Sequence, residues 1–161
     1  MGREFAHNGK LSAGKPRGAG IIFISVFCIA ALLFGEMSVE MFIYLVLVFV
    51  EMLTGFMDDA ADEPWGEYKK GILDFLVAAV AALNYIHFNS TYVELATIGV
   101  KFYIPPVLFF ILTIILVWAA INVTNCSDGV DGLSGTLTII TLVTIYVIDQ
   151  IRGNETQFPY I

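Results

Sequence analysis

Positive charge, cysteine and histidine are all scarce in this sequence of 161 residues. Eight Lys and Arg residues stand against fifteen Asp and Glu residues, which gives a formal net charge of −7. This charge argues against a nucleic-acid-binding protein, because such proteins gather basic residues on one surface. The two cysteines, Cys28 and Cys126, are too few for a disulfide framework, and neither indicates a metal site.

Charge of either sign is also rare. Charged residues make up 14% of the chain and hydrophobic residues 58%, and the mean hydropathy is +0.80, whereas soluble proteins average about 25% charged residues. We therefore predict an integral membrane protein of the all-α class, a single helical bundle with about five transmembrane helices. The apolar runs place these spans at about 21–35, 41–57, 70–87, 105–121 and 133–148.

Five spans put three polar connections on one side of the membrane, namely residues 1–20, 58–69 and 122–132. Six of the Lys and Arg residues fall on that side: Arg3, Lys10, Lys15, Arg17, Lys69 and Lys70. Only Lys101 and Arg152 fall on the other, where a polar connection is expected between the third and fourth spans. Because cytoplasmic loops retain Lys and Arg, we predict that residues 1–20 and both site loops face the cytoplasm.

The segment 119–135 combines polar side chains with glycines at a membrane edge, where polar groups are costly. Its glycines permit close approach to a ligand, and a helix beginning near Leu133 would point free N–H groups at a phosphate. Two carboxylates would repel a bare anion, so we expect Mg²⁺, or else Mn²⁺, between them and the phosphate. The alternative is an ordinary helix N-cap with an acidic first turn. The candidate residues are Asn122, Asn125, Asp128 and Asp131.

A second acidic pair, Asp58 and Asp59, ends the second predicted span. Adjacent side chains on a helix point about 100° apart, so one carboxylate can meet a metal or phosphate while the other faces a lysine. Two negative charges at a helix C-terminus also oppose the helix dipole, so stability alone does not favour them. The alternative is a solvated acidic edge that simply stops the span.

Lys69 and Lys70 open the third predicted span. They are either cytoplasmic anchors that extend to the lipid headgroups or cations that neutralise a diphosphate. Asp74 follows Lys70 by four residues, which suggests an ion pair within one helix.

Glu51 is an ionisable residue inside the second predicted span, and it shares a helix face with Asp58. It either lines the groove leading to the site, or is protonated, or pairs with Asn84 or Trp118 of a neighbouring span. The sequence does not choose between these alternatives.

These motifs resemble those of the polyprenyl-phosphate N-acetylhexosamine 1-phosphate transferase family. The family signature N-x-x-N-x-x-D-G-x-D-G-L is matched by Asn122, Asn125, Asp128, Gly129, Asp131, Gly132 and Leu133. Its G-F-x-D-D stretch is matched at residues 55–59, and its glycine-rich entry loop is present in outline at residues 14–20, with Lys15 and Arg17 where threonines are usual.

The resemblance implies an Mg²⁺-dependent enzyme of the bacterial inner membrane, with its active site on the cytoplasmic face. It would transfer a sugar 1-phosphate from a UDP-activated amino sugar, of the UDP-MurNAc-pentapeptide type, to undecaprenyl phosphate, releasing UMP for peptidoglycan synthesis. Asp58 and Asp59 would be catalytic, and Asp59, Asp128 and Asp131 would bind the metal. Substrate would contact Asn122, Asn125, Asp128, Asp131, Lys69, Lys70, Lys15 and Arg17.

The resemblance covers the N-terminal-to-middle part of the family, whose third acidic motif and histidine-rich loop would lie beyond Ile161. Asp62 stands where the family usually has a lysine. We therefore expect little transfer by these residues alone. Two alternatives stay open: a UDP-GlcNAc-type transferase for another glycan, and a truncated, non-catalytic membrane subunit. A homodimer, or a C-terminal half supplied by a separate chain, stays open as partner.

Overall fold

The computed structural model describes residues 18, 20–61, 63, 65–95, 98–127 and 133–151. These residues form five helices and one hairpin: α1 (Gly20–Phe34), α2 (Val39–Ala60), α3 (Glu67–Phe88), β1 (Tyr92–Leu95), β2 (Val100–Tyr103), α4 (Pro106–Ser127) and α5 (Leu133–Ile151). Three helices, α2, α3 and α4, are long and apolar enough to cross a membrane, and α1 and α5 contain shorter apolar helices. The predicted class, a helical membrane bundle, is confirmed.

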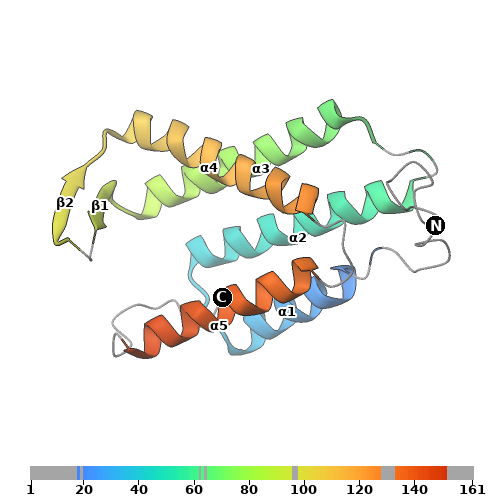
Figure 1. The fold of residues 1–161 in the computed structure, drawn as a ribbon, viewed down its shortest axis with the longest axis horizontal. Helices are drawn as coiled ribbons and strands as arrows, with labels where there is room; N and C mark the ends of the chain where they lie inside the picture. Colours follow the sequence, from blue (N-terminus) through green and yellow to red (C-terminus); the bar gives the residue numbers. More distant parts are fainter. Residues whose placement is uncertain are drawn as a thin grey trace.

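Neighbouring helices in the sequence are also neighbours in space, with α2 between α1 and α3 and with α4 packed on α3 (Figure 1). The α3–α4 contact is built on Ala78 and Ala82, which are fully buried, and on Ile114 of α4. Small residues let two membrane helices approach closely where the hydrophobic effect cannot drive their association. Most large apolar side chains instead point outward, as expected for helices in lipid.

Local sequence signals explain where two of the helices begin. The Ser38 side chain accepts a hydrogen bond from the Met41 backbone N–H at 3.2 Å and caps the start of α2. Pro106 is the first residue of α4, a position where the missing N–H of proline costs nothing.

The helix ends differ from the predicted spans and correct both site loops. Helix α4 continues to Ser127, so Asn122 and Asn125 lie on the helix and not in a loop over 122–132. No glycine or proline interrupts this stretch, and the Asn122 side chain donates to the Trp118 carbonyl at 2.8 Å without leaving the helix. Similarly, α2 includes Asp58 and α3 begins at Glu67, which shortens the connection predicted over 58–69 to residues 61–66.

The connection between α3 and α4 contains a β-hairpin that the sequence analysis missed. Strand β1 pairs antiparallel with β2, with Tyr92 opposite Tyr103 and Leu95 opposite Val100. Gly99 has a φ of +65°, a conformation that glycine adopts without strain, and it lies in the turn. The apolar residues in Tyr-Val-Glu-Leu and Val-Lys-Phe-Tyr were the available signal for two short strands.

The hairpin and the connection between α2 and α3 lie at opposite ends of α3 (Figure 1). If residues 61–66 face the cytoplasm, an introduced cysteine at position 94 in the hairpin will react with a membrane-impermeant thiol reagent added outside the cell. A cysteine at exposed position 67, the first residue of α3, is the matched control and will react only from the cytoplasmic side. Reaction at position 94 from the cytoplasm would contradict the topology.

Candidate functional site

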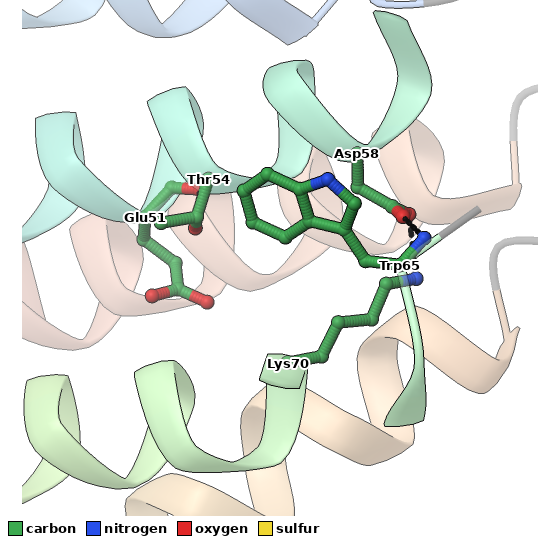
Figure 2. Close-up of polar contacts among 5 residues, drawn as sticks. All are labelled: Glu51, Thr54, Asp58, Trp65 and Lys70. Atoms are coloured by element: carbon green, nitrogen blue, oxygen red, sulfur yellow. Dashed lines mark hydrogen bonds and ion pairs between the residues drawn. The ribbon is translucent and has the colours of Figure 1, made fainter. Parts of the chain in front are cut away.

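Asp58 lies near the end of α2 that is predicted to face the cytoplasm, and it makes the polar contacts that join this end to α3. Its side chain is 7% exposed, and its Oδ2 atom lies 2.5 Å from Nζ of Lys70, which is 17% exposed. Its Oδ1 atom accepts a hydrogen bond from the Trp65 backbone N–H at 2.8 Å. Figure 2 shows the three groups converging between α2 and α3. Both oxygens of Asp58 are therefore occupied, and they hold the start of α3 against the end of α2.

Asp59 has the opposite environment, because its side chain is exposed. The prediction that one member of the acidic pair faces a lysine is thus confirmed, with Asp58 as that member. The positive charge of Lys70 also offsets the unfavourable position of the Asp58 carboxylate at a helix C-terminus. Asp59 is left as the carboxylate of the pair that a ligand can reach.

The two lysines at the start of α3 make different contacts. Lys69 is exposed, and its Nζ atom lies 3.3 Å from the centroid of the Trp65 ring in a cation–π contact. The predicted ion pair within α3 between Lys70 and Asp74 is wrong, because Lys70 pairs with Asp58 across the two helices. The antiparallel arrangement of α2 and α3 brings Asp58 beside the first turn of α3, and the sequence spacing alone could not show this.

Trp118, in the second half of α4, joins this helix to the start of α3. Its indole N–H donates to the Gly71 carbonyl at 3.0 Å, and its ring lies 3.8 Å from where a side chain at Gly71 would begin. Asn122 and Asn125 follow on the same helix, Asn122 half-buried and Asn125 exposed. The structure therefore places these two predicted substrate-binding residues at the end of the bundle that holds Asp58.

Four predicted site residues lie outside the described residues: Lys15, Arg17, Asp128 and Asp131. Within the described part of the chain, no three His, Cys, Asp or Glu side chains gather in a group that could hold a metal. The proposed metal ligands Asp59, Asp128 and Asp131 thus remain a prediction. Both oxygens of Asp58 have partners, whereas Asp59 is exposed.

A family model described as glycosyl transferase family 4 matches residues 41–160. The chain belongs to this family. Two curated relatives, from the Nichols strain and a second strain of Treponema pallidum, are named phospho-N-acetylmuramoyl-pentapeptide-transferase. Each is 41% identical over 132 residues, which is 80% of this chain and 36% of the relative. The chain therefore spans about a third of the length of these relatives. No solved structure gave a significant match.

The match to glycosyl transferase family 4 begins at Met41, and it includes nearly all of α2, the whole of α3 and α4, and most of the chain after them. Both acidic motifs lie inside it, whereas α1 and the entry loop with Lys15 and Arg17 precede it. The family assignment consequently bears on the acidic motifs and not on the entry loop.

Sequence reasoning missed two contacts that hold the ends of these helices together. The Trp65 backbone N–H donates to Asp58, and the Trp118 indole N–H donates to the Gly71 carbonyl. For Glu51, two partners had been considered. Asn84 instead donates to the Glu40 carbonyl at 3.1 Å, and Trp118 to Gly71, so the pairing of Glu51 with either residue is not found.

Proposed function

We propose that this chain is the N-terminal-to-middle part of an enzyme that transfers a sugar 1-phosphate from a UDP-activated amino sugar to undecaprenyl phosphate, releasing UMP. The donor is of the UDP-MurNAc-pentapeptide type, and the product is a lipid-linked intermediate of peptidoglycan synthesis. The names of the 41% identical relatives support this choice. The observation that carries it in this chain is the paired Asp58 and Asp59, one locked by Lys70 and the other exposed.

The reaction is a phosphoryl transfer, in which the protein contributes positioning and charge neutralisation more than covalent chemistry. An oxygen of the lipid phosphate forms a bond to the β-phosphorus of the donor, and the bond from that phosphorus to the bridging oxygen of UMP breaks. Asp58 fixes the ends of α2 and α3 through Lys70 and Trp65, which sets where Asp59 projects. Exposed Lys69 meets the negative charge of the diphosphate.

The nucleotide end of the donor binds at the end of α4. Asn122 and Asn125 supply amide groups there, together with Asp128 and Asp131 of the following segment. The proposed Mg²⁺ would be held by Asp59, Asp128 and Asp131, and when bound it would neutralise the charge of the diphosphate. Lys15 and Arg17 of the entry loop are further candidates for substrate contact.

The site faces the cytoplasm of a bacterial cell in this proposal. The support is the unequal distribution of Lys and Arg, since the basic residues Lys69 and Lys70 lie at the same end of the bundle as Asp58. Activated nucleotide sugars are made in the cytoplasm, so this orientation gives the exposed Asp59 access to them.

The alternative donor is UDP-GlcNAc, for a different lipid-linked glycan. Lys15 and Arg17 stand where the entry loop of related enzymes usually has threonines, and Asp62 stands where a lysine is usual. These differences fall near the donor in our assignment, and they favour testing both donors side by side.

The test of the function uses residues 1–161 joined to the C-terminal part of the Treponema pallidum relative and reconstituted in lipid with undecaprenyl phosphate. We expect UMP release with UDP-MurNAc-pentapeptide and little release with UDP-GlcNAc. Residues 1–161 alone should bind nucleotide and release little UMP. Rapid UMP release with UDP-GlcNAc alone would show that UDP-GlcNAc is the donor. Nucleotide binding without UMP release by the completed protein would favour the non-catalytic subunit.

Asp131→Asn should weaken Mg²⁺-dependent binding of the UDP-sugar, because it removes one anionic ligand of the proposed cation. The measurement is the dissociation constant by calorimetry, in Mg²⁺ and then in chelator. Glu94→Gln in the hairpin, at the other end of α3, is the matched control and should bind like the parent. Equal affinity with and without the metal would identify the segment as a helix cap only.

A further inference from the structure

A line of polar contacts runs between α2 and α3 through an otherwise apolar bundle. At one end Asp58 pairs with Lys70. At the other end the Asn84 side chain donates to the Glu40 carbonyl at 3.1 Å, and the Asn89 side chain donates to Oε1 of Glu40 at 2.5 Å. The same faces of two antiparallel helices therefore stay in contact over most of their length.

Glu51 and Asp74 lie on these facing surfaces between the two ends. Glu51 precedes Asp58 by seven residues, about two helical turns, and Asp74 follows Lys70 by four, about one turn. Figure 2 shows Glu51 directed from α2 towards α3, on the same side of α2 as Asp58. The contact of Asp58 with Lys70 and the contact of Glu40 with Asn84 set a register between the two helices that places Glu51 opposite Asp74. Asp74 is only 7% exposed.

No cation neutralises this pair within the described part of the chain. The nearest basic group on α3 is Lys70, and its ion pair is with Asp58. The other helices packed on these two, α1 and α4, contain no Asp, Glu, Lys, Arg or His, and the thiol of Cys28 is the titratable group that α1 adds. Oε2 of Glu51 is buried and has no hydrogen-bond donor among the described residues.

Two ionised carboxylates can only accept hydrogen bonds, so contact between them requires a proton on one. Without a cation, two charged carboxylates held together in a low-dielectric environment would repel each other. We propose that Glu51 and Asp74 share one proton, and that this bond is a positioning contact that holds α2 and α3 at the separation at which Asp58 reaches Lys70. Only its link to catalysis depends on the proposed function, because protonation and helix positioning are measured without substrate.

The first test is infrared spectroscopy of the 161-residue chain in lipid at neutral pH. The parent should show the C=O band of a protonated carboxylic acid, and both Glu51→Gln and Asp74→Asn should lose it. Glu36→Gln, at an exposed site between α1 and α2, is the matched control and should keep the band. If the parent lacks the band, or if neither amide variant loses it, the shared proton is refuted.

The second test is the pH dependence of unfolding. A folded state that retains a proton which the unfolded chain releases becomes less stable as the pH rises. We expect the unfolding midpoint of the parent to fall as the pH rises from about 4.3, the ordinary pKa of a glutamate, through neutral pH. The midpoints of Glu51→Gln and Asp74→Asn should fall less over the same range. These amides donate a hydrogen bond without needing a proton. Equal pH dependence in the parent and both variants would refute the proposal.

The positioning role is tested by a double-mutant cycle between Asp58 and Lys70, which measures their coupling. The coupling should persist in the Glu51→Gln background, where the hydrogen bond to Asp74 is kept, and decrease in the Glu51→Leu background. If Glu51→Leu does not fold, Glu51→Ala gives the same comparison, and the Gln background alone still tests retention. Equal coupling with and without a polar group at position 51 would refute the positioning role.

Discussion

Lys70→Met is expected to lower the free energy of unfolding by about 3 kcal/mol, at the lower end of the range for breaking one side of a buried ion pair. Asp58 and Lys70 are 7% and 17% exposed, so the pair is largely shielded from water. The Trp65 backbone N–H still donates to Asp58, which is why we expect the lower end. The change leaves a carboxylate buried at a helix C-terminus, where the dipole also disfavours it.

The matched control is Lys69→Met, because Lys69 is the preceding residue, carries the same charge and is exposed. Its loss removes the contact with the Trp65 ring, worth about 0.5–1 kcal/mol at an exposed site. Both variants are measured by reversible unfolding in mixed detergent micelles. Equal effects of the two substitutions would show that the ion pair across α2 and α3 contributes little to stability.

Several features of this site could be predicted because they follow from local geometry. The long apolar runs predicted the helices, since a spanning segment must satisfy its own backbone hydrogen bonds. The divergence of adjacent side chains on a helix predicted that one of Asp58 and Asp59 would face a lysine. The motif around Asn122 predicted the family, which the match to residues 41–160 confirms.

Other features depended on tertiary contacts that no local pattern reveals. In the sequence, Lys70 could form an ion pair with either Asp58 or Asp74. The antiparallel packing of α2 against α3 determines that it pairs with Asp58. That choice leaves Asp74 on the surface of α3 that faces Glu51 of α2, an arrangement of two acidic residues that charge patterning argues against. The end of α4 was also predicted too early. The change from apolar to polar residues marks where a span leaves the membrane, but the helical backbone hydrogen bonds of α4 continue beyond that point to Ser127.

Asp59→Asn is expected to reduce UMP release by the completed protein by about 10² to 10³, the typical cost of removing one well-placed stabilising group from such a site. The reasoning starts from Asp58, whose two carboxylate oxygens are both engaged by Lys70 and Trp65. Asp59 is the exposed member of the pair, so in the proposed reaction it is the carboxylate assigned to the reacting phosphates.

Measuring the stability of each variant distinguishes the role of Asp59 from that of Asp58. Asp59→Asn should leave the unfolding midpoint unchanged, because surface substitutions usually change the free energy of unfolding by less than about 0.5 kcal/mol. Asp58→Asn should lower both stability and UMP release, because the Lys70 ammonium then lacks its buried carboxylate partner. UMP release is followed with undecaprenyl phosphate and UDP-MurNAc-pentapeptide at saturating Mg²⁺. A folded Asp59→Asn protein that releases UMP at the parent rate would remove Asp59 from the chemistry.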